Sequence, residues 1–145
     1  MLYSQPIYNA INLMCEAHGK TLDKSGIPYI FHPYHVAEQM KTEDSVIAAL
    51  LHDVLEDTEF TPEMLKERGV SDRVISALLL LTHRRGVPYM DYIREIKQDP
   101  ISREVKIADL RHNLDETRLL GNIPEKLKKK RPVYLEALDY LLSDD

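Results

Sequence analysis

Apolar residues recur at helical spacing through most of the chain. From Ile7 to Ala17 they follow a period of about 3.6 residues between Pro6 and Gly19. The same period, with a proline or a Ser/Thr cap at each start, predicts further helices over 33–40, 42–57, 61–69, 71–81, 88–97, 100–120 and 124–145, the last broken or kinked at Pro132. No Asn-Gly or Asp-Gly turn joins alternating segments, so the pattern predicts an all-α fold of about eight helices.

Composition narrows the class of protein. A chain of 145 residues, 43% hydrophobic and 30% charged, is typical of one globular domain, which we expect to span 1–145. Its only cysteine, Cys15, is expected to be a small core residue, and a lone cysteine favours the reducing cytoplasm. No apolar run reaches the roughly 18 residues of a membrane span. The net charge of −5 argues against bulk nucleic-acid binding, although one small anionic ligand remains compatible with it.

The most informative stretch lies in the helix expected over 42–57, where four titratable residues follow an apolar run. On a continuous helix His52 and Glu56 lie one turn apart, as do Asp53 and Asp57, and all four fall within about 140° of arc. Clustered carboxylates on so apolar a helix would repel one another unless a cation bound them. The adjacent His and Asp offer a metal ion one nitrogen and one oxygen ligand. The pattern alone leaves a metal site and an exposed polar helix end equally open.

Two other blocks carry polar residues that are candidates for a functional site. Lys106, Asp109, Asn113 and Glu116 share one helical face, a pattern that is also typical of a solvated face. His32 stands directly before a proline at a helix start, so we expect it in an extended backbone. A lone histidine in that position is more often a capping or core residue than a ligand.

Together the three blocks resemble the ligand order of HD-domain metal phosphohydrolases: a His, a His-Asp pair about 20 residues later, and an Asp about 55 residues after that. The flanking residues resemble the hydrolase domain of the RelA/SpoT family, which includes small stand-alone hydrolases of guanosine tetraphosphate (ppGpp). The matching blocks are Gly26-x-Pro28-Tyr29-Ile30-x-His32-Pro33, Ala49-Leu50-Leu51-His52-Asp53-Val54-x-Glu56-Asp57-Thr58 and Lys106-Ile107-Ala108-Asp109-x-x-x-Asn113-Leu114.

The resemblance implies an HD-domain helical bundle with one divalent metal ion. By position its ligands are His32, His52, Asp53 and Asp109. Mn²⁺ is the first expectation, and Zn²⁺, Fe²⁺ and Co²⁺ also suit such a ligand set. In the family, the acidic pair that matches Glu56 and Asp57 positions the attacking water and handles protons. The implied reaction is phosphoester hydrolysis, which for ppGpp releases pyrophosphate from the 3′ oxygen.

A phosphorylated nucleotide is the expected substrate. Its candidate contacts are Lys20, Lys24, Tyr29, Lys106, Asn113, Lys130 and Tyr134. Asp23 falls about where the ppGpp hydrolases carry an Arg, and a carboxylate lacks both the charge and the stacking plane of a guanidinium group. We therefore expect weakened guanine recognition and modest or absent hydrolysis of ppGpp. The other histidines, His35 and His112 among them, are expected outside the ligand set, and His18 at the surface or in a loop.

Three functions stay open on this basis. The first is a (p)ppGpp 3′-pyrophosphohydrolase. The second keeps the metal but acts on a nucleoside monophosphate or another small phosphoester, and the third is a catalytically silent nucleotide-binding regulatory module. Intact ligands together with Glu56 and Asp57 argue against the silent module. The expected partner is a small nucleotide, without nucleic acid or membrane, and the oligomeric state is not predicted.

Overall fold

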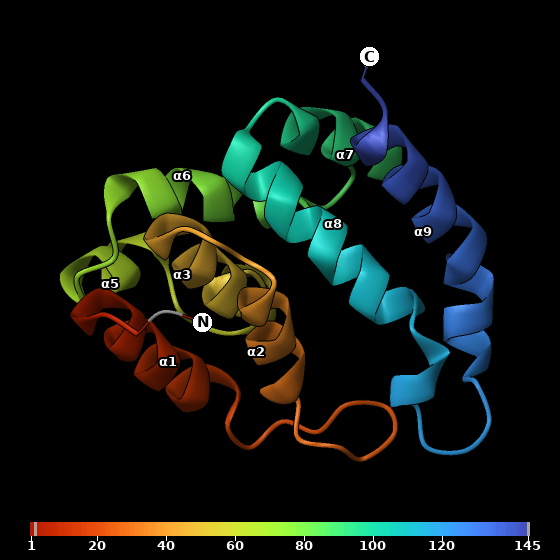
Figure 1. Ribbon diagram of the computed structural model, residues 1–145, viewed down its shortest axis with the longest axis horizontal. Helices are drawn as coiled ribbons and strands as arrows, with labels where there is room; N and C mark the ends of the chain where they lie inside the picture. The colour runs from red at the N-terminus through yellow and green to blue at the C-terminus, as the bar shows by residue number, and fades with distance from the viewer. Residues whose placement is uncertain (2, 145) are drawn as a thin grey trace.

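The computed structural model describes residue 1 and residues 3–144. Within these residues the chain is all-helical and has no strand, as predicted, and none of its helices combines the length and apolar character needed to cross a membrane. The elements are α1 (Gln5–His18), α2 (Phe31–Glu38), α3 (Glu43–Leu51), α4 (Val54–Asp57), α5 (Pro62–Glu67), α6 (Asp72–Leu81), α7 (Tyr89–Lys97), α8 (Pro100–Leu114), the 3₁₀ turn η1 (Glu116–Arg118) and α9 (Glu125–Leu142) (Figure 1).

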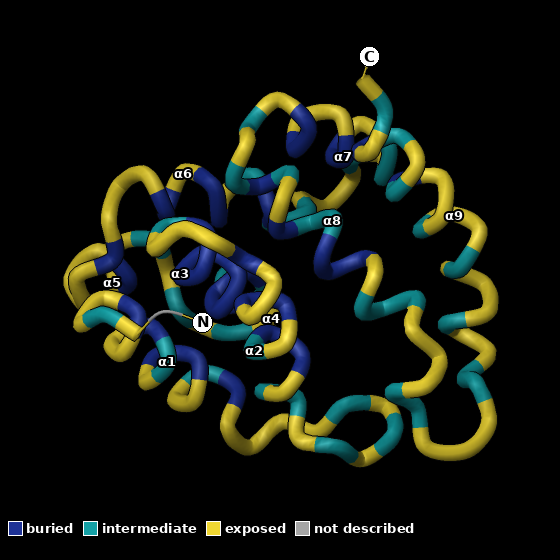
Figure 2. The backbone as a smooth tube through the Cα atoms, in the orientation of Figure 1, coloured by how far each residue is buried: buried dark blue, intermediate teal, exposed yellow. Residues whose placement is uncertain are grey.

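Helix α3 is the centre of the core. Every residue from Ser45 to Leu51 is buried, and α3 packs against α1, α2, α6 and α8 (Figure 2). Helix α8 packs on α2 and α3 and is covered on another side by α9. Helix α9 is mostly exposed and buries only Ala137 and Leu141. The junction of α2, α3 and α8 is therefore the most enclosed place for polar side chains.

Side-chain caps fix the first residues of α3 and α8, two of the three helices that meet at this junction. Thr42 and Ser45 form a capping box that begins α3, with Ser45 N donating to Thr42 Oγ1 at 3.2 Å. Asp99 begins α8 by accepting from Ser102 N at 2.8 Å. These contacts are local in sequence, so the register of both helices follows directly from the residues that flank them.

The predicted continuous helix over 42–57 is wrong, because the chain turns at His52 and Asp53 between α3 and α4. His52 Nδ1 lies 2.6 Å from Ala49 O, the carbonyl that would accept from Asp53 N in an uninterrupted helix. The side chain of His52 thus replaces a backbone donor and ends α3. The four titratable residues do not lie along one helical face.

Helix α8 also ends earlier than predicted. It stops at Leu114, and Asp115 begins η1 by accepting from Thr117 N at 3.0 Å. Glu116 therefore leaves the face it was expected to share and pairs with Arg131 at 3.1 Å. Local side-chain capping by Asp115 competes with the last turn of the helix.

Three smaller expectations are also corrected. Pro132 lies inside α9 without breaking it, since α9 is on the surface, where water can reach a carbonyl that loses its partner. Cys15 is exposed rather than part of the core. His32 lies in the first turn of α2 rather than in extended backbone, because the proline after it falls where a helix needs no N–H donor.

Candidate metal centre and adjoining cavity

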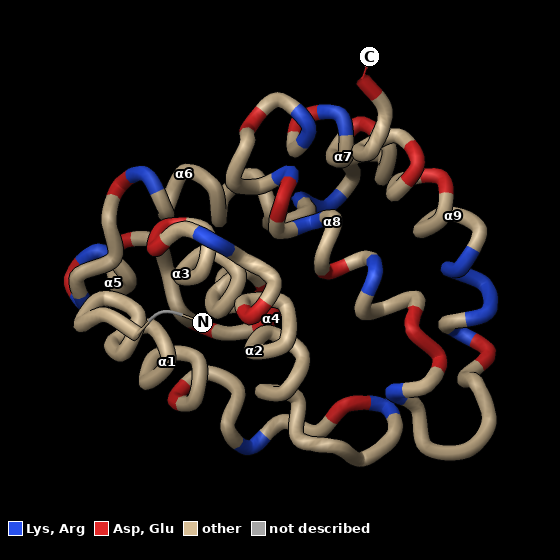
Figure 3. The backbone as a smooth tube through the Cα atoms, in the orientation of Figure 1, with Lys and Arg blue, Asp and Glu red and all other residues tan. Residues whose placement is uncertain are grey.

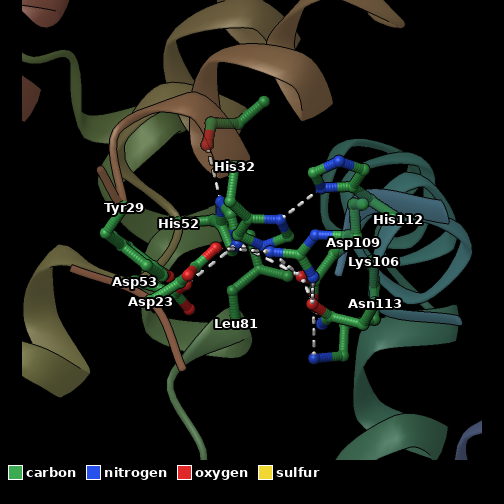
Figure 4. A network of polar contacts seen from close by, with 12 residues as sticks. Asp23, Tyr29, His32, His52, Asp53, Leu81, Lys106, Asp109, His112 and Asn113 are labelled. Atoms are coloured by element: carbon green, nitrogen blue, oxygen red, sulfur yellow. Dashed lines mark hydrogen bonds and ion pairs between the residues drawn. The ribbon is translucent and has the colours of Figure 1, made fainter. Parts of the chain in front are cut away.

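Three predicted ligands converge where α2, α3 and α8 meet (Figure 4). His32, His52 and Asp109 are all buried, and each offers a ligand atom within 4.8 Å of the other two. His32 Nε2 lies 2.9 Å from Asp109 Oδ1, and His52 Nε2 lies 3.4 Å from the same oxygen. Residues 77 positions apart thus form one cluster whose ligand atoms are close enough together to hold a metal ion.

The orientation of His52 fits a bound cation. Because Nδ1 contacts the Ala49 carbonyl, Nε2 is the free ring nitrogen, and it lies 3.2 Å from Asp53 Oδ2. This nitrogen is buried and has no hydrogen-bond partner in the part of the chain that the structure describes. Burial alone would lower the pKa of His52, but the Asp53 and Asp109 carboxylates raise it well above its usual value. The same field that favours a proton at Nε2 favours a metal ion there.

Asp109 is held as a carboxylate by several donors. His32 Nε2 contacts Asp109 Oδ1, and Asn113 Nδ2 donates to the same oxygen at 3.0 Å. Lys106 Nζ donates to the other oxygen, Asp109 Oδ2, at 2.9 Å. Burial would raise the pKa of Asp109, but Lys106 and the two histidines hold it well below its usual range. Lys106 and Asn113, both expected to contact substrate, are therefore also the residues that orient this ligand.

Asp53 lies at the edge of the cluster. Its Oδ2 accepts a hydrogen bond from the hydroxyl of Tyr29 and faces the ring of His52. Burial would raise the pKa of Asp53, but the His52 ring lowers it to about 2, so the carboxylate is ionised at neutral pH. Tyr29, another expected substrate contact, thus fixes the direction of this second carboxylate.

His112 is part of the cluster, although the sequence interpretation placed it outside. Its Nδ1 lies 2.7 Å from His32 Nδ1, and its ring stacks on His32 at 4.9 Å between centroids. His35 stacks on His112 at 4.1 Å. His112 is three residues after Asp109, and such pairs are neighbours on a helix. That spacing could have identified it.

The acidic pair lies one turn beyond the cluster, on α4. Glu56 Oε1 accepts a hydrogen bond from His83 N at 2.7 Å, which ties α4 to the loop after α6. Asp57 remains open to solvent. Desolvation and the nearby Asp53 and Glu56 carboxylates raise the pKa of Asp57 to about 6. A carboxyl group with that pKa can both accept and return a proton near neutral pH.

A cavity of about 330 Å³ adjoins the cluster. Five of the seven predicted substrate contacts line it: Lys24, Tyr29, Asn113, Lys130 and Tyr134. Tyr29 and Asn113 also contact the candidate ligands, so the cavity and the cluster share a wall. Lys106 lies at the cluster, and Lys20 is exposed and does not line this cavity.

Arg118 lines the cavity and was missed by the sequence interpretation. Its Nη1 donates to Asn113 Oδ1 at 3.2 Å, and its Nη2 lies 3.9 Å from Asp23 Oδ2. Asp23 is itself held by the loop, since Oδ1 accepts from Ser25 N at 2.8 Å and Ile27 N at 3.0 Å. No sequence pattern links positions 23 and 118, because only the folded chain brings the two segments together.

His18, expected at the surface or in a loop, is instead buried at the end of α1, with its ring 5.0 Å from that of Tyr29.

No family model matches the chain. It is 32% identical over 140 residues to guanosine-3′,5′-bis(diphosphate) 3′-pyrophosphohydrolase of Aquifex aeolicus, covering 88% of this chain and 20% of that protein. It is 36% identical over 138 residues to the protein of the same name from Haemophilus influenzae, covering 86% and 20%. It is 34% identical over 138 residues to the bifunctional (p)ppGpp synthase/hydrolase SpoT of Escherichia coli, a match that covers 86% of this chain and 19% of that protein.

The chain therefore spans about a fifth of the length of the curated relatives it matches. Among solved structures, it superimposes on a protein described as a metazoan orthologue of SpoT that hydrolyses ppGpp, with a TM-score of 0.78 and 19% identity. That match covers 100% of this chain and 90% of the other. The structural match confirms the predicted helical fold.

Proposed function

Because this chain resembles, over most of its length, one segment of RelA/SpoT-type proteins, we propose that it is a metal-dependent (p)ppGpp 3′-pyrophosphohydrolase. The observation that carries the proposal is the position of the buried His32, His52 and Asp109 group beside a cavity that contains cationic side chains. We propose that residues 1–145 act as a single domain. A single cysteine suits a reducing compartment, so we place the activity in the cytoplasm.

The residues that would hold the ion are His32, His52, Asp53 and Asp109. Two imidazoles with two carboxylates suit Mn²⁺, and also Zn²⁺, Fe²⁺ or Co²⁺. When bound, such an ion polarises a phosphoryl oxygen and lowers the pKa of a coordinated water. Lys106 and Asn113 keep Asp109 in place, and Tyr29 keeps Asp53 in place.

Glu56 and Asp57 would orient the attacking water and accept its proton. Glu56 is held by a hydrogen bond from the His83 amide, whereas the pKa of Asp57 is raised to about 6, so we assign proton acceptance to Asp57. In the overall reaction water adds to the phosphorus at the 3′ oxygen, that P–O bond breaks, and pyrophosphate leaves. The 5′-phosphorylated guanosine product keeps the 3′ oxygen, which takes up a proton and becomes a hydroxyl group.

The cavity would hold the remainder of the nucleotide. Lys24 and Lys130 line it and can bind phosphate, and Tyr134 adds an aromatic surface. Desolvation lowers the pKa of Lys24, and the charges of Lys126 and Lys130 lower it further. Ammonium groups gathered in this way favour an anionic ligand between them. Lys20, on the same loop, is the remaining candidate for an outer phosphate.

The test is pyrophosphate release from ppGpp by the purified chain with Mn²⁺, with an Asp109→Ala variant and a chelator as controls. A panel of nucleoside monophosphates and other phosphoesters separates the alternatives. Turnover of ppGpp that both controls abolish supports the proposal. Turnover of a monophosphate alone would show a different HD-type phosphatase, and nucleotide binding without turnover of any substrate would show a silent module.

A further inference from the structure

Two loops far apart in sequence bring opposite charges together at the cavity. The loop between α1 and α2 carries Asp23, and the segment after α8 carries Arg118. The two segments meet where Leu120 N donates to Ser25 Oγ at 3.3 Å. Figure 3 shows acidic and basic positions close together where the two segments approach each other. Both charged side chains are sheltered, with 16% of Asp23 and 19% of Arg118 exposed. Hydrogen bonds formed in such a place discriminate strongly, because unpaired groups there are costly.

Each of these side chains retains unused bonding capacity toward the cavity. Asp23 uses Oδ1 for two backbone amides, and Oδ2 accepts no hydrogen bond from the described residues. Arg118 uses Nη1 for Asn113, and the 3.9 Å from Nη2 to Asp23 Oδ2 is too long for a hydrogen bond. A carboxylate acceptor and a guanidinium donor therefore stand side by side, both available to a ligand.

This pair complements the edge of guanine. Guanine presents the N7 and O6 acceptors next to the N1–H and N2–H₂ donors, whereas adenine presents a donor at position 6 and an acceptor at N1. An Arg beside an Asp matches the first arrangement and opposes the second. Leu119, Pro124 and Leu127 line the same cavity and can pack on a planar base.

We propose that Asp23 and Arg118 together select guanine, with Arg118 donating to O6 and N7 and Asp23 accepting from N1–H and N2–H₂. The inference rests on the proposed function in treating the cavity as the nucleotide site. Its consequence is opposite to the expectation drawn from sequence, in which Asp23 weakens guanine recognition. Lys24 and Lys130 remain available for the phosphates.

The test is equilibrium binding of GDP, XDP and ADP to the full chain by calorimetry. Xanthine carries a carbonyl where guanine carries its amino group, so an amide should replace the carboxylate as its partner. Asp23→Asn keeps an oxygen for Ser25 and Ile27 and presents an NH₂ in place of Oδ2. We expect wild type to prefer GDP over ADP by roughly 10- to 100-fold. Asp23→Asn should bind GDP about 10-fold more weakly and XDP correspondingly more tightly.

Arg118→Gln should weaken the binding of GDP more than the binding of ADP, and so reduce the preference of the protein for GDP. Arg68→Gln is the matched control, since Arg68 also pairs with a carboxylate, Glu16 at 2.9 Å, but does not line this cavity. If Arg118→Gln lost the same factor of affinity for GDP and for ADP, Arg118 would be a phosphate contact and the proposal would be overturned. An unchanged ratio of GDP to XDP in Asp23→Asn would overturn it as well. GDP binding needs no turnover, so failure of the hydrolase assay is a separate result.

Discussion

The candidate metal centre and the cavity beside it are built in different ways. The centre takes its candidate ligands from α2, α8 and the turn that ends α3, and its three grouped residues are almost fully buried. The cavity is lined by the loop after α1, the end of α8 with the segment that follows it, and one side of the mostly exposed α9. Side chains in the first are fixed by core packing, whereas those in the second are fixed by a few loop contacts. We infer that the fold fixes the chemistry and that loops adjust the choice of substrate.

The largest effect is expected from Asp109→Ala. It removes a proposed ligand and leaves the Lys106 ammonium, on a side chain that is only 13% exposed, without its partner. Breaking a buried ion pair typically costs about 3–5 kcal/mol, so both metal content and the free energy of unfolding should fall. Elemental analysis and urea unfolding measure the two losses. A second change, Lys106→Met, should restore stability but not metal, and recovery of metal in the double variant would contradict the ligand role.

The next effect concerns the acidic pair Glu56 and Asp57, which lies on α4, one turn beyond the cluster. Glu56→Gln or Asp57→Asn should lower kcat by about 10²- to 10⁴-fold with metal content intact. Because the pKa of Asp57 is raised to about 6, its base form accumulates as pH rises through that value. The wild-type rate should therefore increase across this range, and Asp57→Asn should lack that limb of the pH profile. Full activity in both variants would exclude them from the reaction.

A smaller effect, on metal affinity, is expected from changing His112, whose ring contacts the candidate ligand His32. His112→Phe keeps the ring stacked on His32 but removes the nitrogen at 2.7 Å. Loss of a group that orients a metal ligand typically costs about 10- to 100-fold in metal affinity. Titration with Mn²⁺ measures it. His35→Phe is the control, since His35 stacks on His112 and has no hydrogen bond to His32 within the described chain. Equal losses in both variants would mean that stacking alone matters.

The smallest effect is expected in the cavity. Lys130→Gln removes one exposed cation from its lining, and an exposed charge contact contributes about 0.2–1 kcal/mol. KM for ppGpp should rise about 2- to 5-fold while kcat stays the same. Steady-state kinetics at fixed ionic strength measure both. Lys129→Gln, at the neighbouring exposed position outside the cavity lining, should have no effect, and a matching rise there would indicate a general charge effect.

The two regions also differ in how far sequence could predict them. His32, His52 and Asp109 were identified as candidate ligands because the three short blocks that carry them resemble those of HD-domain phosphohydrolases, and the structure brings their side chains together. The turn at His52 was not found, since it depends on a ring that bonds to a backbone carbonyl. Arg118 was not found because its partner is 95 residues away and lies in a loop with no periodic pattern.

The residues expected to contact substrate show the same division. Tyr29 and Asn113 lie in the matching blocks, and in the structure they contact the candidate ligands Asp53 and Asp109. Lys24 and Lys130 come from a loop and from α9, and their common position in one cavity is a property of the tertiary fold. Their roles remain predictions. Short sequence blocks therefore carry information about the candidate metal centre, and only the folded chain carries information about the cavity.

The buried Nε2 of His52 faces two carboxylates without a hydrogen bond, so a cation bound at this proposed site would link its own binding to folding. An ion that binds only the native state at a hundred times its dissociation constant adds about 2.7 kcal/mol of stability. For a domain of this size that corresponds to a rise of about 5–11 °C in melting temperature. Melting curves recorded against concentration therefore rank the divalent ions by thermodynamics alone, in an experiment that contains no nucleotide.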